Sequence, residues 1–278
     1  MKKAKKSPAN IILYTFLALW AAVQLFPLYW MLTFSLKDNN EIFGANIIGL
    51  PHTWRWENYT SILTRGKVGT YFLNSVFVTG CTIILTSIIA LMATYALTRM
   101  IWKGRRLANN TIMLGLTVPI HTAILPIFII LGSLKMTSSY QALIVPYSAF
   151  ALAMAVMICS SLMEGIPKEM EEAAFIDGCS IYGIFIRIIM PLMRPALATI
   201  SIFTYLQAWN ELMFATIFIS DSKYRTLTVG IQTLSGSYTT DWGPIGAALV
   251  IATFPTLIIY MFMSTRIQES LVLGAVKG

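Results

Sequence analysis

The sequence predicts an all-α polytopic membrane protein with six transmembrane helices, and three observations support this fold class. Hydrophobic residues make up 56% of the 278 residues and charged residues only 12%. The mean hydropathy is +0.70, whereas a soluble domain carries roughly a quarter charged residues. Several apolar stretches exceed the ~20 residues that a helix needs to cross a bilayer. The remaining charged residues gather between these stretches, as expected for loops outside the membrane.

Six apolar stretches are interpreted as spans of one domain over residues 1–278. They are residues 11–36, 71–97, 108–132, 141–162, 196–219 and 245–265. The N-terminal MKKAKK with the apolar run behind it resembles a secretory signal. That run is too long for a signal peptide and lacks a small-x-small cleavage site, so we interpret it as a retained first span.

The positions of Lys and Arg predict the orientation. Thirteen of these residues fall on the side of the two termini and seven on the other side. Cytoplasmic loops carry the excess of basic residues, so we expect both termini in the cytoplasm. The net charge of +8 is therefore explained by the basic residues of the cytoplasmic loops, and nucleic acid is not an expected partner.

Prolines interrupt the predicted spans. Pro119 and Pro126 fall in the third span, Pro146 in the fourth and Pro255 in the sixth. Each proline removes a helical hydrogen bond and tends to kink its helix. The kinks could serve packing alone, or they could be hinges for alternating access to the two sides of the membrane.

The sequence carries no motif of an enzyme or of a cofactor site. There is no P-loop, HExxH or GxSxG, so ATP is not bound by a phosphate-cradling loop of this chain. Cys81, Cys159 and Cys179 show no pairing or metal-ligand spacing. We expect neither catalysis nor a cofactor nor a metal.

Four polar residues within the predicted spans are singled out, because polar groups there are costly and usually face a bundle interior or water. They are His121, Gln207, Asn210 and Glu211. Glu211 lies fifteen residues beyond Ala196, roughly 22 Å along a continuous helix. These residues could line a translocation path, or they could be packing and pairing residues.

One charged stretch between spans, PKEMEEAAFIDGCSIYGIFIRIIMP over residues 167–191, predicts a helix, a glycine turn and a second helix. Pro167 suits the first turn of a helix over 168–177. Gly178 suits the left-handed position that ends it. Ser180 suits the N-cap of the second helix, which Pro191 is expected to stop.

The composition of this stretch favours docking of another protein. Ala173 and Ala174 would let a partner approach the backbone closely. Acidic residues surround them, and carboxylates form charge-assisted hydrogen bonds with Arg or Lys. These residues are Glu169, Glu171, Glu172 and Asp177. The alternative is a solvated amphipathic loop helix.

The same stretch resembles the EAA loop of permease subunits from binding-protein-dependent ABC importers. The resemblance rests on Glu172-Ala173-Ala174, Gly178 and Ile188-Ile189-Met190-Pro191, with Met190 where the family usually has Leu. It implies the type I importer permease fold. It also implies that residues 163–195, here called the docking segment, carry the coupling helix that sits in a cleft of a cytoplasmic ATPase.

Further motifs resemble permeases of carbohydrate importers. These are Trp209-Asn210-Glu211, Leu125-Pro126-Ile127-Phe128, Ile144-Val145-Pro146-Tyr147 and the terminal Gly274-Ala275-Val276-Lys277-Gly278. The chain is similar to the smaller six-span partner of the maltose-type permease pair. The resemblance implies that loop 220–244 reaches a sugar-binding protein and that the C-terminal tail contacts the ATPase dimer.

These observations predict a permease subunit of an ATP-driven sugar importer, with an oligosaccharide as cargo, in a bacterial cytoplasmic membrane. The implied partners are a second permease, two ATPase subunits, an extracytoplasmic sugar-binding protein and the lipid bilayer. Three alternatives stay open. They are the same importer with a non-sugar cargo such as an amino acid, polyamine or glycerol phosphate, a membrane-embedded enzyme using His121 and Glu211, and a purely structural membrane subunit.

Overall fold

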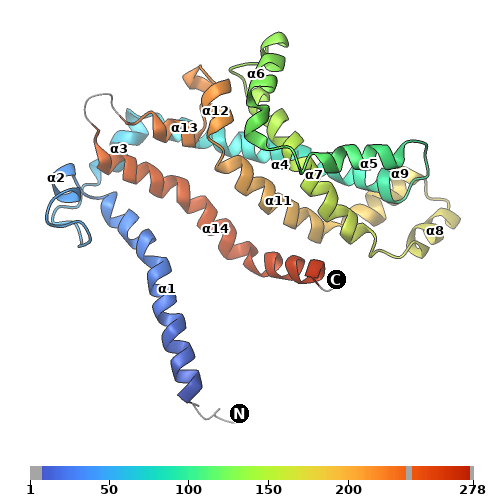
Figure 1. The fold of residues 1–278 in the computed structure, drawn as a ribbon, viewed down its shortest axis with the longest axis horizontal. Helices are drawn as coiled ribbons and strands as arrows, with labels where there is room; N and C mark the ends of the chain where they lie inside the picture. Colours follow the sequence, from blue (N-terminus) through green and yellow to red (C-terminus); the bar gives the residue numbers. More distant parts are fainter. Residues whose placement is uncertain (1–7, 236–239, 276–278) are drawn as a thin grey trace. The chain divides into compact units, whose positions relative to one another are not determined.

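A computed structural model describes residues 8–235 and 240–275. Every regular element in these ranges is a helix, which confirms the predicted all-α class (Figure 1). The basic residues of segment 1–7 and the last three residues of the tail motif lie outside the described part of the chain.

The long helices are α1 (Pro8–Phe34), α4 (Val68–Thr98), α7 (Gln141–Met163), α11 (Arg194–Trp209) and α14 (Trp242–Ala275). The shorter elements are α2 (Asn39–Ile42), α3 (Glu57–Thr64), α5 (Arg105–Leu114), η1 (Ile120–Ala123), α6 (Ile124–Ser133), α8 (Glu169–Ile176), α9 (Ile181–Ile184), η2 (Phe185–Ile189), α10 (Met190–Leu192), α12 (Met213–Phe218), η3 (Ser222–Tyr224) and α13 (Leu227–Gln232).

Four helices, α1, α4, α7 and α14, are long and apolar enough to cross a membrane. The number is five if the bent pair Ile181–Leu192 and Arg194–Trp209 forms one span. By these criteria the described residues do not reach the six continuous spans that the sequence predicts. Two of the predicted spans are broken.

The predicted span 108–132 is wrong as one continuous helix. Helix α5 ends at Leu114, and a new helical segment begins at Ile120 after Pro119, whose ψ of 121° is extended. A proline disfavours helical backbone angles at the residue before it. Pro119 therefore separates two helical segments and does not kink a single helix. Pro126 is the third residue of α6, where the N–H of a helix has no intrahelical acceptor.

The predicted span 196–219 is also broken. Helix α11 ends at Trp209 and α12 begins at Met213. Pro146 and Pro255, in contrast, lie inside α7 and α14 as expected.

The chain clusters into two compact units. Unit 1 comprises residues 1–69 and 230–254, and unit 2 comprises residues 70–229 and 255–278. The single permease domain over 1–278, with the docking segment within it, stays a prediction.

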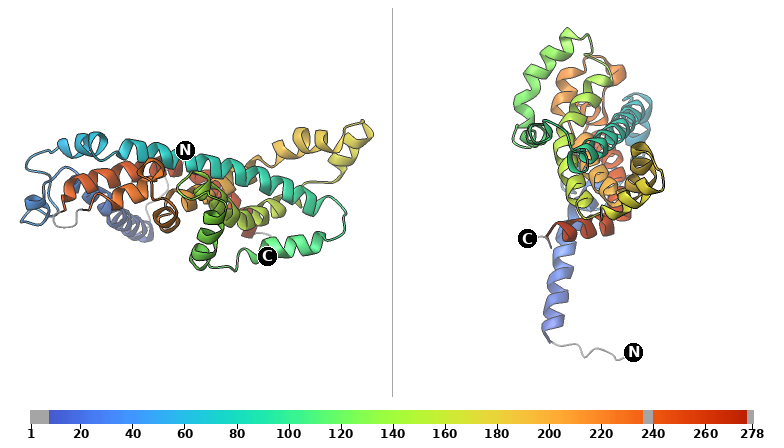
Figure 2. Two further views of the ribbon diagram at one scale, coloured as in Figure 1. Left: turned by 90° about the horizontal axis from the view of Figure 1, so that it is seen from above. Right: turned by 90° about the vertical axis from the view of Figure 1, so that its right-hand side faces the viewer.

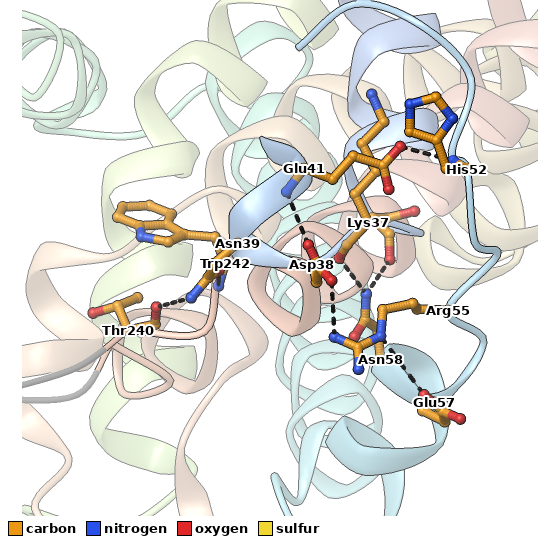
Figure 3. Close-up of polar contacts among 11 residues, drawn as sticks. Lys37, Asp38, Asn39, Glu41, His52, Arg55, Glu57, Asn58, Thr240 and Trp242 are labelled. Atoms are coloured by element: carbon orange, nitrogen blue, oxygen red, sulfur yellow. Dashed lines mark hydrogen bonds and ion pairs between the residues drawn. The ribbon is translucent and has the colours of Figure 1, made fainter. Parts of the chain in front are cut away.

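Unit 1 contains a buried lysine directly after α1. Lys37 is only 1% exposed, and its Nζ donates to the backbone oxygens of Asn46 at 2.7 Å and Ile47 at 3.3 Å. The Asn58 side-chain amide donates to the backbone oxygens of Ser35 at 2.9 Å and Lys37 at 3.0 Å (Figure 3). These bonds tie the loop after α1 and the start of α3 to the end of α1.

The same region joins the start of α14. The Asn39 amide donates to the Thr240 oxygen at 2.8 Å, and its oxygen accepts from the Trp242 N–H at 2.9 Å (Figure 3). Gly243 lies so close to the Lys37 oxygen and the Asn58 amide that an added Cβ would clash with both. We call Lys37, Asn39, Asn58 and Gly243 the Lys37 joint.

Unit 2 is built on α7, which packs along α11 and also contacts α5 and α12. One apolar cluster includes Ala155, Cys159 and Met163 of α7 with Ala196 and Ile200 of α11, and it extends to the docking segment. A second cluster surrounds the aromatic side chains Tyr147, Phe214 and Phe218. Small residues on both helices allow the close approach that membrane helix pairs use.

Candidate functional site

The docking segment begins with the predicted helix. Helix α8 covers Glu169–Ile176, with Lys168 as its N-cap, close to the predicted 168–177. Pro167 precedes the N-cap instead of lying in the first turn. Three carboxylates occupy that turn, where the positive end of the helix dipole stabilises negative charge. Figures 1 and 2 show α8 and α9 at one end of unit 2.

Gly178 ends this helix as predicted. Its φ is +81°, a value that glycine adopts without the cost other residues incur. The turn is closed by N–H bonds from Gly178 to Phe175 at 3.0 Å and from Cys179 to Ala174 at 2.9 Å. An added Cβ at Gly178 would meet nothing within 4 Å, so the backbone angle alone requires glycine here.

The second helix starts as predicted but does not stop at Pro191. Ser180 accepts from the Gly183 N–H at 3.2 Å and caps α9. The helix then widens into the π-helix η2 and continues through α10, which contains Pro191. Pro191 has no N–H for the carbonyl of Arg187, so the ladder expands ahead of it. The direction changes at Met193, with a bend of 70° to α11.

The two alanines of the segment face different surroundings. Ala174 is only 8% exposed and belongs to an apolar cluster of unit 2, whereas Ala173 is exposed. Glu169, Glu172 and Asp177 are exposed as well. Bulky apolar side chains lie beside them in solvent, with exposed fractions of 69% for Phe175, 84% for Ile176 and 79% for Tyr182. This docking face combines an acidic rim with apolar side chains, the composition of a protein-binding surface.

Glu171 does not belong to the acidic rim. Its Oε1 lies 2.8 Å from Nε of Arg99, and the two side chains are 14% and 8% exposed. Nη2 of Arg99 also donates to the backbone oxygens of Met163 at 2.8 Å and Ile166 at 2.6 Å. We call Arg99, Glu171 and these two oxygens the Arg99 clamp.

Sequence reasoning missed this clamp, because Arg99 counted only as a topology residue and Glu171 as one of several carboxylates. Helical spacing held a signal. Glu171 and Ala174 are three residues apart and share one side of α8. A buried Ala174 therefore places Glu171 toward the protein and leaves Glu172 outward.

Glu211 lies in the break between α11 and α12, not on a continuous helix. Its carboxylate accepts from the N–H groups of Phe214 at 2.9 Å and Ala215 at 3.1 Å, and from the Tyr147 hydroxyl at 2.5 Å. Thr228 donates to its backbone oxygen at 2.9 Å. The Glu211 carboxylate thus satisfies two N–H groups in the first turn of α12 from the position before the N-cap residue Leu212.

The other candidates for a translocation path are dispersed. Gln207 lines a cavity of about 230 Å³ with residues of α7 and α11. Asn210 is exposed at the end of α11 and donates to the Leu206 oxygen at 2.9 Å. His121 is exposed in η1. Within the described ranges, no hydrogen bond or ion pair joins His121 to Glu211.

The fold is that of a solved importer. A bacterial ABC transporter involved in the import of the acidic polysaccharide alginate contains a chain that matches with a TM-score of 0.80. The match covers 95% of this chain and 99% of that chain at 19% identity. It supports the importer permease fold that the docking segment predicted.

Sequence comparison identifies the family. The family model for the binding-protein-dependent transport system inner membrane component matches residues 86–272. The probable ABC transporter permease protein YurM of Bacillus subtilis (strain 168) is 36% identical over 95% of this chain and 88% of its own length. The trehalose/maltose transport system permease protein MalG of Thermococcus litoralis is 33% identical over 97% of both chains. This chain therefore belongs to the family of binding-protein-dependent transport system inner membrane components, as a permease subunit of an ABC importer and not an enzyme.

Proposed function

We propose that this chain forms half of the translocation path of a sugar importer and receives ATP-driven motion through the docking segment. The observation that carries the proposal is the exposed face of α8, where Glu172 and Ala173 project beside a glycine turn. A small side chain permits close approach, and a free carboxylate offers a charged hydrogen bond to a basic residue of an ATPase. The named cargo of the trehalose/maltose relative and the Trp209-Asn210-Glu211 motif support a sugar.

The proposed assembly contains a second permease, two cytoplasmic ATPase subunits and an extracytoplasmic sugar-binding protein. Both termini face the cytoplasm, which puts the docking segment on the ATPase side and loop 220–244 on the side of the binding protein. A reporter fused to the C-terminus tests this orientation, because an externally accessible tail would contradict it. Cargo profiling of the binding protein tests the sugar against amino acids, polyamines and glycerol phosphate.

Three substitutions test the coupling role. Glu172→Lys reverses a charge on the docking face, Ala173→Trp blocks close approach, and Gly178→Val strains the left-handed turn. Each should abolish sugar uptake while the chain still inserts into the membrane. The ATPase subunits should then dissociate, or hydrolyse ATP without responding to the loaded binding protein.

Glu57→Lys is the matched control for charge reversal, because the Glu57 side chain is 84% exposed in unit 1. It should transport at the wild-type rate. Wild-type uptake by all three docking variants would remove the docking segment from the coupling role. It would favour a purely structural subunit.

The path through the membrane is proposed to include Gln207, Asn210, Glu211 and His121. Glu211→Gln keeps the shape of the cap and one acceptor oxygen, so the protein level should stay near normal while uptake kinetics or cargo choice change. Unaltered kinetics would assign Glu211 to capping of α12 alone.

A further inference from the structure

We infer that Arg99 is a positioning residue that makes α8 move together with the ends of α4 and α7. This inference rests on the proposed coupling role of the docking segment and concerns how motion leaves that segment. Arg99 follows α4 directly, and its N–H continues the helix by bonding the Tyr95 oxygen at 2.9 Å. The guanidinium is therefore held close to the last turn of a predicted span.

The clamp joins three helices through one side chain. The guanidinium donates to the oxygens of Met163, the last residue of α7, and of Ile166, just beyond it. The Met163 oxygen also accepts from the Ile166 N–H at 3.1 Å, in the turn that follows α7. The same guanidinium pairs with Glu171 of α8. The planar guanidinium directs Nη2 to the two backbone oxygens and Nε to the carboxylate, a fixed geometry that the ammonium of a lysine does not reproduce.

The space around the Arg99 clamp shows why the ion pair matters for contact between α4 and α8. Beside it lies a groove of about 860 Å³ between the end of α4 and helices α8 and α9, lined by Tyr95, Trp102 and Phe175 among others. Side chains therefore do not fill the space between α4 and the outer part of α8. Contact on that side is made by the Arg99–Glu171 pair, by Ala174 and by Tyr95, whose hydroxyl also faces Glu171.

The neighbouring carboxylates then have separate tasks. Glu172 points outward to the proposed ATPase contact, and Glu171 points inward to Arg99. A displacement of α8 by the partner is passed through Glu171 and Arg99 to α4 and α7. Loss of the pair should leave docking intact and interrupt the transfer of motion.

The test uses the complete importer reconstituted in proteoliposomes with its binding protein. Arg99→Met should insert, retain the ATPase subunits and keep basal ATP hydrolysis. Stimulation by the loaded binding protein should fall about tenfold or more, the size of a typical coupling between two sites, because the ion pair that ties α8 to α4 and α7 is lost. Arg99→Lys should fall between this variant and the wild type. Arg106→Met is the matched control, since Arg106 is exposed at the start of α5 and carries an equal charge.

A second measurement reports the position of α8 directly. Cys179 follows the glycine turn and is partly buried against the apolar cluster that contains Ala174. In a Cys81→Ala, Cys159→Ala background, Arg99→Met and the milder Glu171→Gln should raise the rate of maleimide labelling of Cys179 several-fold. Arg106→Met should leave this rate unchanged. If Arg99→Met does not accumulate in the membrane, Arg99→Lys and Glu171→Gln decide the question.

The outcomes separate this inference from the proposed function. Full stimulation and unchanged labelling in the Arg99 and Glu171 variants would overturn the clamp. If Glu172→Lys and Ala173→Trp still abolish uptake in that case, the coupling role of the docking segment stands. Wild-type uptake by those two docking variants would instead overturn the proposed function itself.

Discussion

Two buried cations, Lys37 in unit 1 and Arg99 in unit 2, are held by different acceptors. Lys37 donates to the backbone oxygens of Asn46 and Ile47, and among the described residues no ion pair involves it. Burial lowers the pKa of Lys37, and the nearby charge of Glu41 partly offsets this effect. Arg99 has backbone oxygens as well, but it also faces the carboxylate of Glu171.

The difference lies in what each cation leaves behind when it is removed. A backbone oxygen near the surface can turn to water, whereas the mostly buried carboxylate of Glu171 loses the cation that it faces. Replacing a whole buried pair by apolar residues is often neutral, but removing one partner is strongly destabilising. The Arg99 clamp should therefore be sensitive to single substitutions, and the Lys37 joint more tolerant of them.

The largest expected effect separates the two sites. Arg99→Met should lower the free energy of unfolding by about 3–5 kcal/mol. Lys37→Met keeps most of the apolar stem and should cost less, about 1.5–3 kcal/mol, the net worth of a hydrogen bond that involves a charged group. Thermal or denaturant unfolding of the purified chain in detergent measures both.

The double variant Arg99→Met with Glu171→Met sharpens this comparison. It should be more stable than Arg99→Met alone, because no unpaired carboxylate remains. Lys37→Met and Arg99→Met could instead lower the free energy of unfolding equally, without recovery in the double variant. That result would show that a carboxylate acceptor and a backbone acceptor make the same difference to stability.

A glycine in each region tests a second contrast, between space and backbone angle. Gly243 has no room, since a Cβ would meet the Lys37 oxygen and Asn58, so Gly243→Ala should cost about 1–3 kcal/mol through overpacking. Gly178 has room but a φ of +81°, so Gly178→Ala should cost about 1–2 kcal/mol.

Asparagine distinguishes the two causes in the same unfolding experiment. Gly178→Asn should recover part of the loss, because Asn tolerates the left-handed region. Gly243→Asn should be worse than Gly243→Ala, because its side chain is larger. If Asn were worse than Ala at position 178, lack of space would be the cause there. If Asn were better than Ala at position 243, the backbone angle would be the cause there.

The features that the sequence predicted well are local ones. The left-handed angle of Gly178 and the cap by Ser180 follow from the chemistry of single residues over one turn. The all-α membrane class follows from the amino-acid composition and the long apolar stretches, which do not depend on how the helices pack. The importer family followed from one motif with fixed spacing, 172–191.

The features that it predicted poorly depend on neighbours in space. A proline can end a helix, kink it or widen it, and Pro119 and Pro191 show the first and third outcomes. Packing around each proline decides among these outcomes. The pairing of Arg99 with Glu171 joins residues far apart in the chain, and burial of Lys37 depends on a loop that folds back over it.

A smaller effect concerns pH and involves Lys37 alone. Burial favours the neutral amine, so the folded chain binds this proton less tightly than the unfolded chain does. Between the lowered pKa and the ordinary lysine pKa of 10.5, the unfolded chain holds more protons, and stability contributed by this site rises with pH. Below that window both states are protonated, and the cost of burying the charge is constant.

The measurement is the difference between wild type and Lys37→Met in unfolding temperature, followed from about pH 8 to about pH 10. The wild type should gain on the variant as pH rises. Parallel curves would mean that Lys37 keeps its ordinary pKa in the folded chain, and they would remove this distinction between the two cations.

The smallest expected effects come from one helix cap in each region. The Asp38 carboxylate accepts from the Glu41 N–H at 2.8 Å, and the Ser180 hydroxyl accepts from the Gly183 N–H at 3.2 Å. Asp38→Ala and Ser180→Ala should each cost about 0.5–2 kcal/mol, with Asp38→Ala the larger because its bond is shorter and charged. Asp38→Asn is the control, since it keeps the cap and loses only the exposed ion pair with Arg55 at 3.7 Å, which is worth about 0–1 kcal/mol. A loss from Asp38→Asn equal to that from Asp38→Ala would assign the effect to the ion pair, and the caps of the two regions would then no longer be comparable.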